Sequence, residues 1–151
     1  MKPSRVETLR LLQRVARVRE TQVTTKHASA QAREQVKQQC VVAHERQSQE
    51  LGRTLSAVQA KTPIDIARWQ LLTVIVDEAS RRLATETQAL EELRLERQRL
   101  LAEVAARAGE RRRVDEKHDV AAAAARRALE SHSEAERGED WLASMRRGDA
   151  T

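Results

Sequence analysis

The 151-residue chain has no Phe and no Tyr, and its only aromatic residues are Trp69 and Trp141. A globular core of this length normally uses aromatic side chains to fill its interior. Their scarcity therefore argues against a compact globule with an enzyme-like pocket. Ala, Leu, Arg, Glu and Gln dominate instead, which is the usage of long helices and coiled coils. The composition predicts a single all-α domain.

Cysteine and long apolar runs are also scarce. Cys40 is the only cysteine, which excludes an intramolecular disulfide and fits a reducing compartment. We interpret it as a small apolar residue, with a reactive thiol as the alternative. The strongest apolar cluster, Leu71 to Val76, is far shorter than the roughly 18 residues that cross a bilayer. Charged residues interrupt the apolar ones near Met1, unlike a secretory signal. The sequence predicts a cytoplasmic protein without direct membrane insertion.

Proline and glycine are nearly absent from two long stretches that have helical periodicity. From Val58 back to Val6, alternate steps of three and four residues meet apolar side chains at nine of 16 positions, which predicts a seam with a polar middle. From Trp69 to Val104 the same spacing meets apolar residues at nine of 11 positions. Beyond that the pattern thins through Val114, His118, Ala121, Ala125 and Ala128.

Pro63 separates these two stretches. A proline inside one continuous helix would cost about 3 kcal/mol, so we expect the chain to turn here. Thr62 is the expected N-cap of the second helix, Pro63 its first residue, and Asp65 lies near its positive end. Ser4 and Glu7 form a capping-box pattern for the first helix.

The predicted fold is an all-α, long antiparallel two-helix coiled-coil hairpin, because short connections join antiparallel helices. It comprises residues 1–137, with helices at about 4–60 and 64–137, a turn at 61–63 and a flexible tail at 138–151. Pairing residues whose numbers add to about 124 places Val41 beside Leu83. From about Val120 the second helix has no partner in the hairpin. This Ala-rich overhang is either simply a strong helix former or a docking surface.

No constellation for catalysis or metal binding is present. The four histidines lack a histidine neighbour three or four residues away, and the four glycines are isolated, so neither a helical zinc site nor a phosphate loop is predicted. We expect a protein that is not an enzyme and that binds no cofactor or metal. The histidines are interpreted as polar residues near the seam or exposed.

Basic residues are concentrated in the first stretch. Residues 1–62 carry twelve Lys or Arg and five Asp or Glu, a net charge of +7, whereas residues 63–151 carry 16 and 18, a net charge of −2. Arg10, Arg14 and Arg17 share one helix face, and antiparallel pairing brings Arg111 to Arg113 and Lys117 to the same end. This basic end is a solvated face, a binding surface for an acidic protein, or a site for nucleic acid or anionic lipid. Nucleic acid is less favoured because aromatic stacking residues are missing there.

The residues after the turn are apolar. Ile64, Ile66, Trp69 and Leu72 lie close together in the sequence. Trp69 either closes the seam or serves as an anchor for a partner, as exposed tryptophans often do.

Two segments resemble FliJ/YscO-type stalk proteins of flagellar and type III secretion export machines. The segment "ARWQLL", Ala67 to Leu72, has the Arg-Trp pair that this family places just after its turn, and "RRRVDEKHDVAAAAARR", Arg111 to Arg127, is similar to the family's late basic segment. The corresponding positions there are Arg113, Asp115, Lys117, Asp119, Ala122 and Arg126. The resemblance covers about residues 1–130, and the remaining segment from Gly138 has no counterpart in the family.

The resemblance implies an antiparallel coiled coil, similar to the two-helix part of a rotary-ATPase stalk, that inserts its paired ends into a hexameric export ATPase. It also implies contact with the membrane protein of the export gate and with secretion chaperones, at a cytoplasmic site peripheral to the membrane-embedded apparatus. The residues expected at the ATPase are Arg5, Arg10, Arg14, Arg17, Arg111, Arg113, Asp115, Lys117, Asp119 and Arg126. Those expected at the gate are Ile66, Trp69 and Leu72. The alternative is a general coiled-coil scaffold or a basic helical protein associated with nucleic acid.

Overall fold

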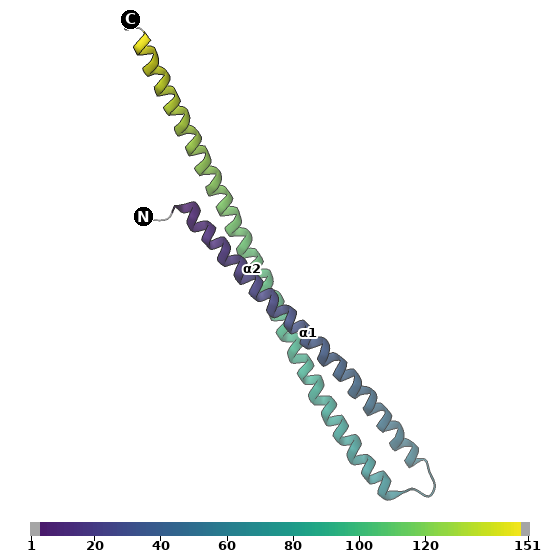
Figure 1. The fold of residues 1–151 in the computed structure, drawn as a ribbon. Coiled ribbons are helices and arrows are strands. Elements are labelled where there is room, and N and C mark those ends of the chain that lie inside the picture. The colour runs from purple at the N-terminus through teal and green to yellow at the C-terminus, as the bar shows by residue number, and fades with distance from the viewer. Residues whose placement is uncertain (1–3, 149–151) are drawn as a thin grey trace. The chain divides into compact units, whose positions relative to one another are not determined.

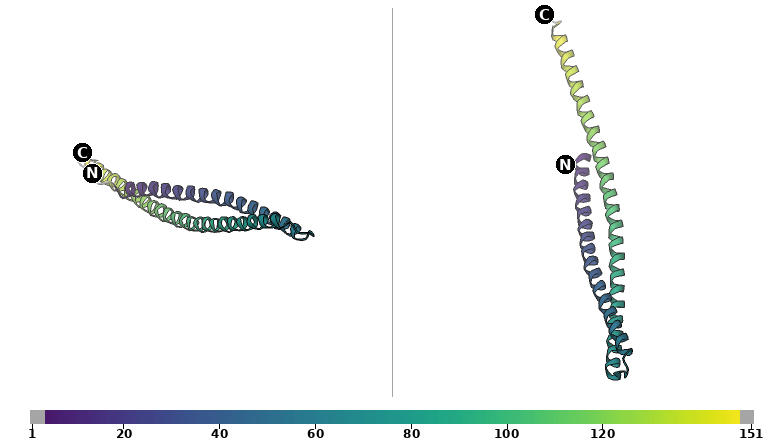
Figure 2. Two further views of the ribbon diagram at one scale, coloured as in Figure 1. Left: turned by 90° about the horizontal axis from the view of Figure 1, so that it is seen from below. Right: turned by 90° about the vertical axis from the view of Figure 1, so that its right-hand side faces the viewer.

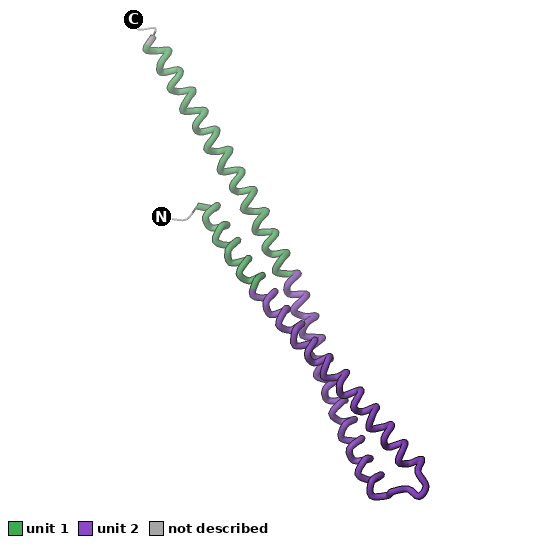
Figure 3. Tube along the Cα trace, turned by 45° about the vertical axis from the view of Figure 1, so that its right-hand side comes forward, with its two compact units in different colours: residues 1–21, 106–151 green, residues 22–105 purple. Residues whose placement is uncertain are grey.

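The computed structural model describes residues 4–148, which form two long helices and no strand (Figure 1). Helix α1 spans Arg5–Gln59, helix α2 spans Ile66–Gly148, and residues 60–65 connect them. The predicted all-α hairpin of two helices is confirmed. The chain divides into two compact units, residues 1–21 with 106–151 (unit 1) and residues 22–105 (unit 2) (Figure 3). Within each unit, a segment of α1 lies beside a segment of α2 in every view (Figure 2).

The capping box predicted at the start of α1 is present. The Ser4 backbone N–H donates to Glu7 Oε2 at 2.8 Å, and the Glu7 N–H donates to Ser4 Oγ at 3.2 Å. The two bonds satisfy backbone donors that have no partner inside the helix. The hydrogen bond from the Ser4 backbone, followed by that from its side chain, lowers the pKa of the Glu7 carboxyl. The first helix therefore begins where the sequence predicted.

The start of α2 differs from the prediction. Asp65, and not Thr62, caps this helix: the Arg68 N–H donates to Asp65 Oδ1 at 3.0 Å, and the Trp69 N–H donates to the Asp65 carbonyl at 2.9 Å. Pro63 consequently lies in the connection and is not the first helical residue. Asp is as strong an N-cap as Ser or Asn and also favours the positive end of the helix. The reversal of chain direction at Pro63 was predicted correctly, but its length was underestimated.

The end of α2 also differs from the prediction. The helix continues through Gly138 to Gly148, where the sequence suggested a flexible tail over 138–151; residues 149–151 lie outside the described range, as do residues 1–3. One glycine inside a helix costs only about 1 kcal/mol relative to alanine. The residues around Gly138 are mostly good helix formers, such as Glu136, Arg137 and Glu139. A single glycine among them is therefore insufficient to end the helix.

Unit 2 contains most of the buried residues. Val23, Ala30, Val41, Val58 and Leu90 are buried there, with Ala30 fully covered and Leu90 only 2% exposed. All five occupy seam positions that the periodicity predicted. Each of the 16 predicted positions of α1 and each of the 11 from Trp69 to Val104 in α2 is buried or half-buried. The spacing of apolar residues thus identified the contacting faces of both helices, including their polar positions.

Polar contacts between α1 and α2 join side chains beyond the predicted register. In unit 2, Glu34 pairs with Arg97, and Arg33 pairs with Glu96 at 2.9 Å. A pairing that adds to about 124 would place Glu34 beside Leu90, two turns earlier in α2. Side chains in a helix point toward its N-terminus, so two antiparallel helices lean their side chains in opposite directions. In these two pairs the side-chain tips that meet therefore belong to residues with higher numbers than the predicted register gives, whereas Lys37 and Glu86 pair at that register.

Unit 1 has a smaller buried core. Ala16 is the only buried residue among its described residues, with Leu9, Gln13, Val114 and His118 half-buried. From residue 123 to residue 147, α2 has exposed side chains at all positions except Ser133 and Ala143, which are half-buried. This segment continues past the N-terminus of α1 within unit 1 (Figure 1). We call residues 123–148 the overhang.

Candidate partner-binding surfaces

Three arginines form an exposed row on α1 in unit 1. Arg10, Arg14 and Arg17 are exposed and spaced by four and three residues, so one helix face carries them. Among the described residues, none of the three forms a salt bridge, although ion pairs occur elsewhere in both units. We call these residues the basic stripe. Glu7 lies near enough to Arg10 for their charges to interact, and the three cations together leave a positive field that is available to an acidic ligand.

An apolar row lies directly beside the basic stripe. Leu11, Val15 and Val18 repeat the same spacing one residue later, and each is about half exposed. Leu11 and Val18 point away from the seam residues Leu9 and Ala16, whereas Val15 also lines a space between α1 and α2. We call them the apolar stripe. The prediction from sequence missed it, although its helical spacing is visible between the arginines.

Arg111 and Asp115 are used inside unit 1. Arg111 Nε lies 2.6 Å from Glu20 Oε2 on α1, and one of its terminal nitrogens lies 2.9 Å from Asp115 Oδ2. Gln13 Nε2 on α1 donates to Asp115 Oδ1 at 2.9 Å. The hydrogen bond with Glu20 is the main reason that the pKa of Arg111 is raised. Both residues were expected at a partner, and their present contacts join α1 to α2.

Other predicted residues of the basic end surround a hollow. Arg113 and Lys117 on α2 line a space of about 320 Å³ together with Arg19, Leu12 and Val15 on α1. Its lining combines four apolar residues with three cations and one acidic residue, Glu110. A side chain that carries both an apolar stem and an acidic head would fit this combination.

The remaining predicted residues are more scattered. Arg5 lies exposed at the start of α1, Asp119 lies 3.3 Å from His118 Nδ1, and Arg126 is exposed in the overhang. All ten residues expected at an ATPase belong to unit 1. The basic stripe, Arg113 and Lys117 therefore lie in one unit. Arg111 and Asp115 of the same unit contact Glu20 and Gln13 of α1.

The connection between the helices borders a second hollow. Ile64, Ile66 and Trp69 line a space of about 660 Å³ with Gln59 and Thr62. Trp69 is half-buried and Leu72 is half-buried, whereas Ile66 is exposed. Trp69 thus covers part of the seam and also presents part of its ring to the hollow. The two interpretations of Trp69 from the sequence are compatible.

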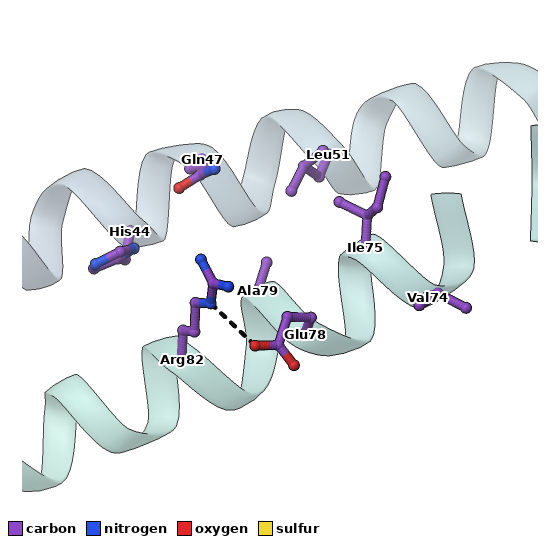
Figure 4. Close-up of a pocket in the computed structure, with 8 residues that line it drawn as sticks. All are labelled: His44, Gln47, Leu51, Val74, Ile75, Glu78, Ala79 and Arg82. Carbon is purple, nitrogen blue, oxygen red and sulfur yellow. Dashed lines mark hydrogen bonds and ion pairs between the residues drawn. The ribbon is translucent and has the colours of Figure 1, made fainter. Parts of the chain in front are cut away.

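A third hollow lies between the helices of unit 2 and offers little chemistry. His44, Gln47 and Leu51 of α1 border it from one side, and Ile75, Glu78 and Arg82 of α2 from the other (Figure 4). Arg82 Nε pairs with Glu78 Oε1 of its own helix at 3.0 Å. His44 and Glu78 both line the hollow, and the Glu78 carboxylate is engaged by Arg82.

Histidines in the seam act as polar spacers. His27, His44 and His118 are half-buried at predicted seam positions, and His132 is exposed. The Nε2 atoms of His27 and His118 are buried without a hydrogen-bond partner within the described structure. Across residues 4–148, no three or more His, Cys, Asp or Glu side chains gather as metal ligands would.

Over the same residues, neither helix has an apolar stretch sufficient to span a membrane. Comparison with models of protein families, with curated proteins and with solved structures gives no match for this chain.

Proposed function

We propose that the chain is a central stalk or coupling component of a type III secretion or flagellar export apparatus. In this role it binds a hexameric export ATPase, promotes assembly of the ring and its ATP turnover, and couples the ATPase to the export gate. The observation that carries the proposal is the basic stripe of unit 1, whose three arginines are exposed and, among the described residues, form no salt bridge, beside exposed apolar residues. The resemblance of Arg111 to Arg127 and of Arg68–Trp69 to FliJ/YscO-type proteins supplies the identity of the partner.

The proposed contact with the ATPase involves unit 1. Arg10, Arg14 and Arg17 bind acidic side chains that line the ring, and Arg113 and Lys117 add charge from α2. Arg111 and Asp115 support this surface from within, because they fix α2 against Glu20 and Gln13 of α1. The mechanism is mechanical: an asymmetric pair of helices favours one arrangement of subunits over others in a six-fold ring. The chain itself binds no nucleotide in this proposal.

The proposed contact with the gate involves the connection in unit 2. The hollow around Ile64, Ile66 and Trp69 has an apolar lining, which suits a protruding apolar side chain of the gate protein. Leu72 supports Trp69 from the next turn of α2. Secretion chaperones are further partners implied by the resemblance.

The first experiment mixes the chain with the export ATPase from the same cell and measures ATP turnover and ring formation. Stimulation of both is expected, and the triple variant Arg10→Glu, Arg14→Glu, Arg17→Glu is expected to abolish it. The matched control reverses three exposed arginines of unit 2, Arg46→Glu, Arg53→Glu and Arg81→Glu, and should retain stimulation. If the wild-type chain changes neither turnover nor ring formation, the proposal is wrong.

A second variant separates the two contacts. Trp69→Ala should leave ATPase stimulation unchanged and reduce export of a reporter substrate in cells, because Trp69 belongs to unit 2 and the basic stripe to unit 1. Equal loss of both activities would contradict this division.

The alternative, a basic scaffold associated with nucleic acid, is distinguished by salt. Binding through phosphate contacts falls steeply and linearly on a logarithmic salt scale. Binding of DNA or RNA with such a slope, together with no effect on the ATPase, would favour the alternative.

A further inference from the structure

The overhang presents an exposed face that combines acidic and apolar residues. Glu130, Glu134, Trp141 and Met145 are spaced by four, seven and four residues, so they share one face of α2. Trp141 is 58% exposed and Met145 is 51% exposed. Among the described residues, neither Glu130 nor Glu134 forms a salt bridge. Large apolar side chains on a helix without a packing partner are typical of an interaction surface.

This face is complementary to the α1 surface of the same unit. Residues 130–145 carry five acidic residues and one Arg, a net charge of −4, whereas residues 5–19 carry five Arg and one Glu, a net charge of +4. Each stretch is about 23 Å long at about 1.5 Å per residue. Both also have exposed apolar residues: Trp141 and Met145 on the overhang, and the apolar stripe on α1. The two surfaces therefore match in length, in charge and in apolar content.

The overhang cannot satisfy the α1 surface of its own chain. Helix α2 is continuous from Ile66 to Gly148, so residues 130–145 extend beyond the N-terminus of α1 and do not fold back onto it (Figure 1). A second copy of the chain has no such restriction. We propose that two copies associate through unit 1, with the acidic face of each overhang lying against the basic stripe of the other copy.

Two-fold symmetry makes this contact occur twice in the dimer. When the two copies point their overhangs in opposite directions, each overhang runs parallel to α1 of the other copy, since α1 and α2 are antiparallel within a chain. Glu130 and Glu134 then face Arg10 and Arg14, which have the same spacing of four residues. In this register Trp141 and Met145 lie level with Thr21 and Thr25, just past the apolar stripe. The contact removes part of the exposed apolar surface of Trp141 and Met145 from water.

The inference does not depend on the proposed export function, because it requires only the chain itself. The two proposals do share Arg10 and Arg14, so the dimer and the ATPase complex would compete for one surface. Dimerisation is measured without the ATPase, and ATPase stimulation is measured at chain concentrations below the dimer dissociation constant. Under these conditions either proposal can fail without affecting the test of the other.

The test is analytical ultracentrifugation of the full chain over a range of protein and salt concentrations. We expect a monomer–dimer equilibrium that weakens as salt is added, because exposed charges are screened. The double variants Arg10→Glu, Arg14→Glu and Glu130→Arg, Glu134→Arg should each weaken the dimer at least about tenfold, since every contact occurs twice and attraction becomes repulsion. Reversal of Arg46 and Arg53 in unit 2 is the matched control and should leave the dimer unchanged.

Mixing the two double variants gives the decisive result. One variant has two acidic surfaces and the other has two basic surfaces, so a heterodimer restores both contacts even though each variant alone is mainly monomeric. Trp141→Ala should also weaken the dimer while leaving the helical circular dichroism of the dilute chain unchanged. A chain that is monomeric under all conditions would overturn the proposal. So would a dimer that resists both double reversals, or a mixture of the two variants that forms no heterodimer.

Discussion

Units 1 and 2 use the same pair of helices in different ways. In unit 2, five apolar residues are buried, and ion pairs such as Arg33–Glu96 and Lys37–Glu86 join α1 to α2. In unit 1, only Ala16 is buried among the described residues, whereas the basic stripe, the apolar stripe and the overhang are exposed. Unit 2 therefore buries more of its seam and pairs several charges across it, although Val36, Leu71 and Val74 are exposed there as well. Unit 1 retains groups that a second molecule can satisfy.

Units 1 and 2 differ more in where their apolar residues lie on the helices than in which residue types they contain. Both units contain Leu, Val and Arg, but the apolar residues of unit 2 lie mostly on the seam, and unit 1 has a second apolar row outside it. A helix whose apolar residues occupy one stripe buries them against one neighbour. The apolar stripe of α1 is left largely exposed in unit 1.

The largest effect is expected from truncating the core of unit 2. Leu90→Ala removes a side chain that is 2% exposed, and we expect the free energy of unfolding to fall by about 2–4 kcal/mol. Urea denaturation followed by circular dichroism measures this change. Leu95→Ala on the exposed side of α2 is the control, with an expected change within about 0.5 kcal/mol. Similar losses for the two variants would show that the seam is not the main source of stability in unit 2.

A smaller effect is expected in the overhang. A Cβ built on Gly138 meets nothing within 4 Å, so Gly138→Ala should stabilise the helix locally by about 0.5–1 kcal/mol. Hydrogen exchange of the amides in residues 130–145 should slow correspondingly. Gly52→Ala, where a Cβ is equally unobstructed, is the matched change in unit 2. Its local protection should rise less, because packing against α2 already holds that helix. If Gly52→Ala slowed local hydrogen exchange more than Gly138→Ala does, α1 in unit 2 would be held less firmly than the overhang, contrary to expectation.

The smallest effect concerns the pair of Lys37 and Glu86. Lys37 Nζ lies 2.7 Å from Glu86 Oε2, and this hydrogen bond lowers the pKa of Glu86 below 4.5 and raises the pKa of Lys37 above 10.5. The ion pair therefore stabilises the folded chain at pH values between the lowered pKa of Glu86 and the raised pKa of Lys37. The contribution of Glu86 is lost as the pH falls through its lowered pKa, and that of Lys37 is lost as the pH rises through its raised pKa.

Glu86→Gln is the corresponding variant. It should lower Tm by roughly 2 °C at pH 7, and its Tm should approach that of the wild type as the pH falls below 4.5. Thermal melts from pH 7 to pH 3 test this convergence. A difference in Tm that remains constant over this range would mean that the ion pair does not produce the effect.

The seam was predictable from sequence because helical periodicity is a property of single residues and their spacing. Glu34, Lys37 and Glu86 were assigned to the seam by position alone, and the structure places all three there, half-buried. The capping box of Ser4 and Glu7 is equally local. These features need no knowledge of the partner helix.

The partners across the seam were not predictable in the same way. Which arginine meets Glu34 depends on how far each side chain leans along its helix, and backbone register does not determine this. The cap of α2 was assigned to Thr62 because Pro63 favours a first helical position, but Asp65 competes for the same role. The extension to Gly148 was not predicted, although the unfavourable helix propensity of one glycine is small beside the favourable propensities of the residues around it. The candidate site on unit 1 was predicted for its charge and not for its apolar stripe.

Ala30 is the most completely covered residue of unit 2 among those described. Its side chain is a single methyl group, and none of it is exposed, so the groups around it leave no free space at this position. A bulkier side chain here would have to push its neighbours aside. Since both helices continue without a break on either side, that displacement would extend over several helical turns.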